Sequence, residues 1–231
     1  MVEPGIAAAE YAVFLFSTVC HEAAHATSAR WLGDDTASRG GQVSLDPVPH
    51  IRREPIGMVA VPLIGLFSGG YVMGWASTPY DPVWAESHPK RAAVMAAAGP
   101  LANLGLVLVA AALICVGVAL GMVEGADSIG SYHVVVPLAG QAAWVGPVAM
   151  LVSLFFTLNL MLFFFNLLPV GPLDGASVLA LVPGLSDASA WLRSPRIRLF
   201  GLLVAWQVFP YIYDPIFTKC LNILFPGSNY H

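Results

Sequence analysis

The sequence predicts an all-α membrane protein, a polytopic helical bundle of about four to five transmembrane helices. Of its 231 residues, 57% are hydrophobic and only 10% are charged, whereas soluble domains carry about 25% charged residues. Apolar runs long enough to cross a bilayer recur along the chain. The net charge of −4 shows no basic excess, so the expected partner is the lipid bilayer and not a nucleic acid.

The N-terminal half contains one clear span and one irregular apolar segment. Residues 6–31 form the first apolar run and predict the first membrane helix. The loop that follows, residues 34–55, is polar and turn-rich, and the alternation over Gln42–Leu45 predicts a short β element there. Residues 56–75 are apolar enough to span, but Pro62 and several glycines interrupt them. We therefore predict a re-entrant or broken segment, because irregular backbone at membrane depth must be covered by protein or line a cavity.

The C-terminal half contains the remaining predicted spans. Three apolar runs cover residues 92–122, about 147–168, and 197–217. A polar connection at 124–132 separates the first two, and a loop at 170–192, rich in proline and glycine, separates the last two. The whole chain, residues 1–231, is expected to form one integral-membrane domain without a soluble module.

The basic residues predict how the chain is oriented. If residues 56–75 do not cross the membrane, all of the 10 Lys and Arg residues except Lys219 lie on one side. Basic loops are retained on the cytoplasmic side of a membrane. The asymmetry thus favours four full spans and a cytoplasmic position for the loops that follow the first span.

Two histidines near the end of the first span predict a metal site. His21 and His25 are four residues apart, which places both imidazoles on one helix face, about one turn apart, where they can share a tetrahedral Zn²⁺. Glu22 lies beside them and could take a proton from a metal-activated water, as in the H-E-x-x-H arrangement of zinc hydrolases. So short a pattern occurs by chance, but histidine and glutamate are costly at the edge of an apolar run and indicate function there.

Two histidines do not complete a hydrolytic zinc site, which needs a third protein ligand and an open position. The best candidate is Asp174, just past the end of a span on the same predicted side; it could also, or instead, cap the short helix that follows. Asn166 could hydrogen-bond a substrate carbonyl or oxyanion, or it could pair with backbone carbonyls freed by Pro169. Asn103 is interpreted as a residue that packs helices together.

Three stretches together resemble the signature of a known family: His21–His25, Gly99–Asn103 and Asn166–Gly175. Their order, approximate spacing and membrane setting are similar to those of the site-2 protease family of intramembrane zinc metalloproteases, in its compact bacterial branch. The resemblance covers about residues 13–181 and leaves 197–217 as an extra C-terminal helix. Ala24 departs from the family, which often has glycine there, and no insert is long enough for a PDZ domain.

The resemblance implies the roles of the site residues. It implies one Zn²⁺ per chain, with His21, His25 and Asp174 as ligands, Glu22 as the catalytic general base, and Asn166 as a catalytic residue that orients the substrate or stabilises an oxyanion. The histidines in the polar loops, at positions 50 and 88, are expected to be mostly solvated.

The function implied is that of a zinc-dependent intramembrane endopeptidase in regulated intramembrane proteolysis. Its partner would be a transmembrane protein substrate, and its location a bacterial inner membrane, as a multi-pass protein with the active site towards the cytoplasm. We expect the substrate to dock by edge pairing at the broken segment 56–75, with residues 59–61 as the positions that test this. The alternative is a non-proteolytic membrane zinc protein, either a metal transporter or a scaffold. A transporter would need a polar path to both faces, and a scaffold would leave Glu22 without a role.

Overall fold

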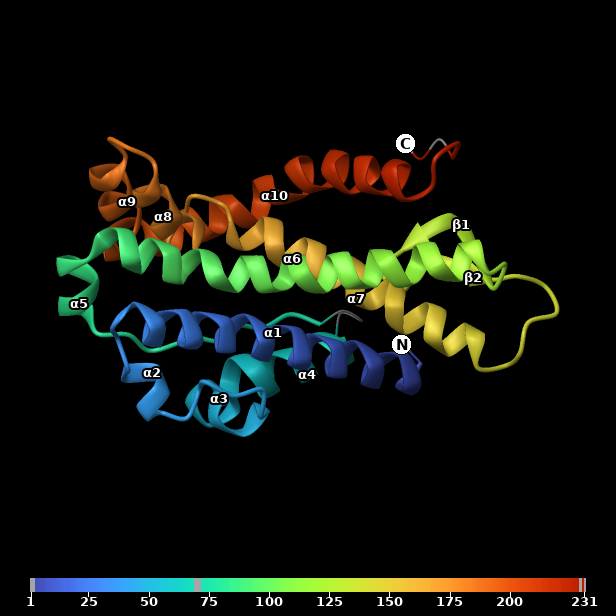
Figure 1. Cartoon of the computed structure of the whole chain (residues 1–231), viewed down its shortest axis with the longest axis horizontal. Helices are drawn as coiled ribbons and strands as arrows, with labels where there is room; N and C mark the ends of the chain where they lie inside the picture. The colour runs from blue at the N-terminus through green and yellow to red at the C-terminus, as the bar shows by residue number, and fades with distance from the viewer. Residues whose placement is uncertain (1–2, 69–71, 229, 231) are drawn as a thin grey trace.

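Four long helices dominate the computed structural model, which describes residues 3–68, 72–228 and 230 (Figure 1). They are α1 (Pro4–Leu32), α6 (Pro89–Ala119), α7 (Val145–Asn166) and α10 (Pro195–Leu224). Among the described helices, α6, α7 and the Leu199–Leu224 part of α10 are long and apolar enough to cross a membrane. Helix α1 has the length but is not among them, because its polar residues lower its mean hydropathy. The prediction of a mostly helical membrane protein is confirmed.

Helices α1 and α6 pack against each other over much of their length, and small residues line their interface near the C-terminal end of α1. The buried alanines of this region come from both helices: Ala23, Ala26 and Ala29, and Ala92, Ala93 and Ala96. Small side chains let two helix backbones approach closely. This approach brings the backbone of α6 beside the histidines of α1.

The opposite end of the bundle carries a two-stranded antiparallel sheet. Strand β1 (Val123–Gly130) pairs with β2 (His133–Pro137), with a register shift between Gly125 and Gly130. The hydroxyl of Ser153 on α7 accepts hydrogen bonds from the backbone N–H groups of Val134 (3.1 Å) and Val135 (3.3 Å). The sheet is therefore attached to α7 at the end of the bundle opposite α5 and α9 (Figure 1).

The β element predicted at Gln42–Leu45 is wrong, because these residues form no strand. The loop after α1 instead forms two short helices, α2 (Thr36–Arg39) and α3 (Pro47–Arg53). Asp46 caps α3 by accepting a hydrogen bond from the N–H of Val48 (2.9 Å), and the proline that follows suits the first helical position. A four-residue strand needs a partner, and none of the described neighbours of this loop supplies one.

Residues 56–75 do not form one continuous helix. Pro62 and Gly65, which were expected to interrupt it, lie inside a helix, and the predicted breaks at Gly69 and Gly70 lie outside the described residues. A π-helical turn (Ile56–Ala60) leads into α4 (Val61–Ser68), and the chain is extended from Val72 to Asp81. The N–H of Trp75 donates to the carbonyl of Gly57 (3.1 Å), so the two ends of this segment are adjacent. A Cβ atom on Gly57 would overlap the carbonyl oxygen of Trp75. Glycine is thus what allows the two backbones to meet.

Asp34 joins the end of α1 to the start of α5 (Pro82–Ser87). Its carboxylate accepts hydrogen bonds from the N–H groups of Thr36 (2.9 Å) and Asp81 (2.9 Å). Burial alone would raise the pKa of Asp34, but the hydrogen bonds from Thr36 and Asp81 lower it below its ordinary value. The ionised carboxylate therefore holds the far end of the extended segment beside α1.

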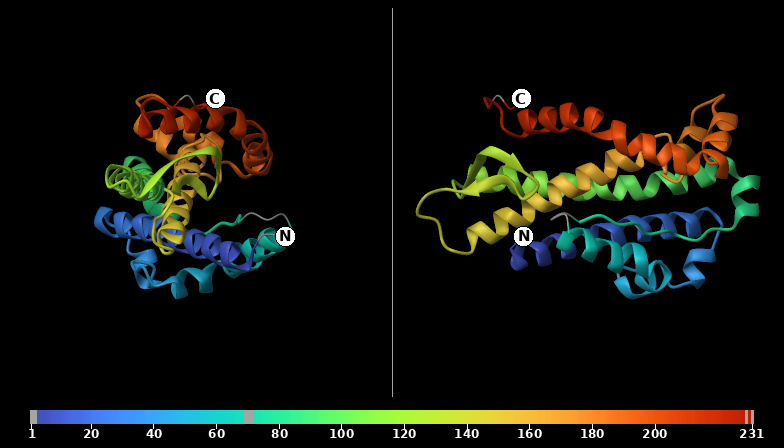
Figure 2. Two further views of the ribbon diagram at one scale, coloured as in Figure 1. Left: turned by 90° about the vertical axis from the view of Figure 1, so that its right-hand side faces the viewer. Right: turned by 180° about the vertical axis from the view of Figure 1, so that it is seen from behind.

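The C-terminal part of the chain lies on the side of α6 and α7 that is opposite to α1 (Figure 2). After α7, the chain forms α8 (Gly175–Val178), a 3₁₀ turn (Leu179–Leu181) and α9 (Ser186–Leu192). Helix α10 then packs on α7 through aromatic contacts such as Phe165–Phe209, whose ring centroids are 5.0 Å apart. The layers are thus α3 and α4, then α1, then α6 and α7, then α10.

Candidate active site

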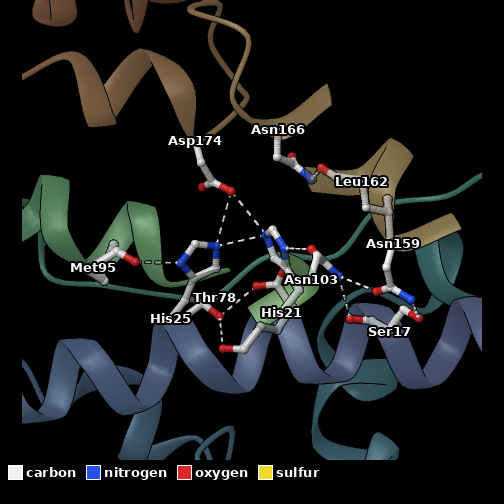
Figure 3. Close-up of polar contacts among 11 residues, drawn as sticks. Ser17, His21, His25, Thr78, Met95, Asn103, Asn159, Leu162, Asn166 and Asp174 are labelled. Atoms are coloured by element: carbon white, nitrogen blue, oxygen red, sulfur yellow. Dashed lines mark hydrogen bonds and ion pairs between the residues drawn. The ribbon is translucent and has the colours of Figure 1, made fainter. Parts of the chain in front are cut away.

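His21, His25 and Asp174 converge on one point between α1, α6 and the start of α8 (Figure 3). The two Nε2 atoms of the histidines are 3.0 Å apart. Oδ2 of Asp174 lies 3.1 Å from Nε2 of His21 and 3.3 Å from Nε2 of His25. The structure therefore brings the three predicted ligands together across 153 residues of sequence.

This cluster fits a zinc ion. Ligand atoms that bind zinc at about 2.0–2.1 Å in a tetrahedron lie roughly 3.3 Å from one another, close to the separations observed. Nδ1 of His25 donates to the carbonyl of Met95 (2.8 Å), and a carbonyl can only accept. Nε2 of a neutral His25 is therefore an acceptor, and it faces a carboxylate oxygen. Acceptor atoms that converge in this way are stabilised by a positive charge between them, which a zinc ion would supply.

Gly99 of α6 leaves the space that the cluster occupies. A Cβ atom at this position would overlap Nε2 of His25 and press against Nε2 of His21. Glycine is thus the residue that allows the backbone of α6 to lie against both imidazoles. Gly175 allows a second close approach, between the start of α8 and the end of α7, because a Cβ atom there would overlap the carbonyl oxygen of Leu167. This close turn holds Asp174 next to the end of α7.

Asp174 occupies the N-cap position of α8, but its side chain makes no capping hydrogen bond. The carboxylate of Asp174 therefore does not cap α8, and its Oδ2 points instead at the two histidines (Figure 3).

Glu22 is buried beside the cluster, at 5% exposure. The hydroxyl of Thr78 donates to Oε2 of Glu22 (2.7 Å) and lies 3.0 Å from its backbone carbonyl. Both residues line a cavity of about 190 Å³ that the histidines and Asp174 also line. The predicted base therefore shares one cavity with the predicted ligands. Thr78 did not emerge from the sequence, because its only signal was a polar side chain in a proline-containing loop.

Residue 77, the neighbour of Thr78, anchors the extended segment to the loop after α1. The hydroxyl of Ser77 donates to the carboxylate of Glu54 (2.5 Å) and accepts from Nε of Arg53 (3.2 Å). The side-chain amide of Gln42 donates to the backbone carbonyl of Ser77 (3.3 Å). Successive side chains of an extended chain point to opposite sides, so Ser77 faces α3 while Thr78 faces Glu22.

Two asparagines approach the cluster in different ways. Asn166 lines the same cavity, and its amide nitrogen donates to the carbonyl of Leu162 in its own helix (3.0 Å). Asn103 is fully buried, and its Oδ1 lies 2.6 Å from Nδ1 of His21. The interpretation of Asn103 as only a packing residue is therefore incomplete, because it contacts a predicted ligand directly.

The loop histidines lie outside the cavity. His50 is 1% exposed in α3, and its Nε2 lies 3.0 Å from the carbonyl oxygen of Ser44, so the expectation that it is solvated is wrong. His88 precedes α6 and makes a hydrogen bond from Nδ1 to the carbonyl of Trp84 (3.1 Å).

Residues 59–61 are helical, so a substrate strand cannot dock there by edge pairing, since helical backbone groups bond within the helix.

Comparison with known proteins agrees with this geometry. Residues 9–190 match the family model described as peptidase family M50. The chain is 31% identical over 205 residues to a Bacillus subtilis (strain 168) protein named "Putative zinc metalloprotease YwhC", and the alignment covers 87% of this chain and 82% of that protein. No solved structure gives a significant match.

Proposed function

The chain belongs to peptidase family M50, the site-2 type of membrane metalloprotease, and from this premise we propose that it is a zinc-dependent endopeptidase that cleaves transmembrane segments of other membrane proteins. The observation that carries the proposal is the convergence of His21, His25 and Asp174 in one cavity with Glu22. Membership of the family implies zinc, and we propose one ion per chain.

The proposed chemistry divides between the metal and the chain. Bound zinc supplies Lewis acidity, which activates water and polarises a scissile carbonyl. His21, His25 and Asp174 would hold it and leave one position open. Glu22 takes a proton from the attacking water and delivers it to the leaving amine. The hydroxyl of Thr78 holds Oε2 of Glu22 at 2.7 Å, which fixes where that proton is accepted.

Asn166 is proposed to orient the substrate. An amide nitrogen has two hydrogens, and one of those of Asn166 is engaged by Leu162. The second is available for a substrate carbonyl or for the oxyanion that develops from it. Because Asn166 and Asp174 line the same cavity, such a carbonyl would lie close to the ligands.

The substrate would enter the cavity in an unwound form. A helix with its side chains is about 10–12 Å across, so even one of its turns needs more room than the cavity of about 190 Å³ provides. A locally extended stretch fits this space better than an intact helix, and unwinding also frees the scissile carbonyl from its helical hydrogen bond. The extended segment 72–81, with Thr78 in the cavity, is the part of the protein that an extended substrate would meet.

We further propose a bacterial inner-membrane location with the active site towards the cytoplasm. The loops and helix ends with most of the basic residues, near α2, α3, α5 and α9, gather at one end of the molecule, and the two-stranded sheet lies at the other (Figure 1). The contact between Gly57 and Trp75 supports a re-entrant segment, because a segment whose ends meet enters and leaves on the same side.

The test compares metal content and cleavage in the purified full-length protein. Wild type should contain one zinc per chain and cut a tagged transmembrane substrate. Glu22→Gln should keep its zinc but lose cleavage by about 10²–10⁴-fold, because general acid–base catalysis contributes that much. Asp174→Ala should lose zinc and cleavage together.

Retained cleavage by Glu22→Gln would defeat the mechanism. Zinc in the wild type without cleavage of any transmembrane substrate would favour the alternative, a metal transporter or a scaffold.

A further inference from the structure

A buried polar network connects His21 to the helices on either side of it. Asn103 on α6, Asn159 on α7 and Ser17 on α1 are all 0% exposed. Oδ1 of Asn103 lies 2.6 Å from Nδ1 of His21. Nδ2 of Asn103 donates to Oδ1 of Asn159 (2.8 Å). Nδ2 of Asn159 in turn donates to the hydroxyl of Ser17 (2.9 Å; Figure 3) and to the backbone carbonyl of Phe155 (2.9 Å).

The direction of this network is set by backbone carbonyls, which can only accept. The carbonyl of Phe155 requires the amide nitrogen of Asn159 beside it, so Asn159 turns its oxygen towards Asn103. Asn103 then places its nitrogen towards Asn159, and this nitrogen also lies 3.4 Å from the backbone carbonyl of Ser17. The oxygen of Asn103 is left facing Nδ1 of His21. That oxygen can only accept, so the ring hydrogen of a neutral His21 belongs on Nδ1.

The consequence reaches the metal position. When Nδ1 holds the hydrogen, Nε2 of His21 has a free lone pair, and Nε2 is the atom that faces Asp174 and His25. His25 reaches the same state by a different route, because its Nδ1 donates to the backbone carbonyl of Met95. His25 is thus oriented by a backbone carbonyl, whereas His21 is oriented by the side chain of Asn103, which a substitution can remove.

We propose that Asn103 and Asn159 are positioning residues that hold His21 with its hydrogen on Nδ1 and its Nε2 lone pair directed at the zinc position. The inference rests on the proposed function, in which His21 is a zinc ligand. Partners that orient a ligand in this way typically contribute 10–100-fold to metal affinity. Asn103 acts directly on His21, and Asn159 acts through Asn103.

A purely structural role is the competing explanation, because the same network joins α1, α6 and α7. The two roles differ in what they predict. A structural role lowers the thermal stability of the metal-free protein and leaves its zinc affinity unchanged. The positioning role lowers zinc affinity, and an acceptor oxygen at residue 103 restores that affinity.

The experiment measures the apparent zinc Kd of the purified full-length protein by competition with a chelator, together with the melting temperature of the metal-free form. Asn103→Leu should bind zinc about 10–100-fold more weakly. Asn103→Asp keeps an acceptor oxygen towards His21, and its carboxyl in the protonated form donates to Oδ1 of Asn159 as Nδ2 does in wild type. This variant should therefore return the Kd to within a few-fold of wild type. Asn159→Leu should weaken zinc binding by less than Asn103→Leu. The amide of Asn103 then loses its hydrogen bond to residue 159 but still faces His21.

Ser153→Ala is the matched control. Ser153 is equally buried on α7, but its hydroxyl bonds to Val134 and Val135 of the sheet. This variant should lower the melting temperature and leave the zinc Kd at the wild-type value. Absorption of the Co²⁺-substituted protein should change in Asn103→Leu and remain as in wild type in Ser153→Ala.

Zinc binding at wild-type strength in a folded Asn103→Leu protein would overturn the proposal, as would a loss in Asn103→Asp as large as that in Asn103→Leu. If Asn103→Leu does not fold, a zinc Kd of Asn159→Leu equal to that of wild type would overturn it. A wild-type protein that binds no zinc would instead defeat the proposed function, and this inference with it.

Discussion

At the scale of single residues, Gly99 sets how close α6 can come to the two histidines of the proposed zinc site. A Cβ atom at this residue would overlap Nε2 of His25. Gly99→Ala should therefore push the imidazoles out of their arrangement with Asp174 and reduce zinc affinity by at least about tenfold, in the range seen when ligand orientation is lost. Metal analysis of the purified variant after dialysis against a weak chelator measures this loss.

Gly105 provides the control for this change on the same helix. A Cβ atom there would meet no atom within 4 Å. Gly105→Ala should keep full zinc content, and it should stabilise α6 by up to about 1 kcal/mol, since alanine is the better helix former. A Gly99→Ala protein with the same zinc content as Gly105→Ala would show that α6 can move away at little cost.

At the scale of elements, the extended segment 72–81 brings a side chain to the proposed base. Thr78→Val preserves shape but removes the hydroxyl that donates to Oε2 of Glu22. A hydrogen bond to a charged group contributes about 1.5–3 kcal/mol. We therefore expect kcat to fall by about tenfold or more, with the zinc content unchanged. Steady-state cleavage of a transmembrane peptide, paired with metal analysis, separates the two effects.

Thr27→Val is the corresponding control, because the hydroxyl of Thr27 donates to the carbonyl of Ala23 in its own helix (2.6 Å) and, among the described residues, to no group of the cavity. It should retain wild-type kcat. If Thr78→Val also cleaves at the wild-type rate, the extended segment serves to line the cavity and has no part in orienting Glu22.

At the scale of the whole molecule, the two ends of the bundle should lie on opposite sides of the membrane. Ser87 at the end of α5 and Ser128 in β1 are both exposed, and they mark these two ends. With the three native cysteines replaced by alanine, Ser128→Cys should react with a membrane-impermeant maleimide on intact cells. Ser87→Cys should react only after the membrane is opened. Equal labelling of both on intact cells would contradict the proposed orientation.

The long helices followed from the sequence because helix formation and membrane insertion depend on neighbouring residues. The predicted runs 6–31, 92–122, 147–168 and 197–217 correspond to α1, α6, α7 and α10. Their ends differ by one to three residues, except that α10 continues to Leu224. The pairing of His21 with His25 was equally local, since a helix places residues four apart on one face. The short strand at 42–45 was wrong because a strand depends on a partner elsewhere in the chain.

Only the tertiary structure decided how the distant parts of the site combine. It placed Asp174 against both histidines, Thr78 against Glu22, and Asn103 against His21. None of these contacts has a local signature, because each joins residues that the sequence separates by more than 50 positions. The sequence by itself indicated the membrane class, the two histidines with Glu22 beside them, and Asp174 as the candidate third ligand. The packing of α1 with α6 and α7 determined which polar groups the histidines face, because hydrogen bonds reach only about 3 Å.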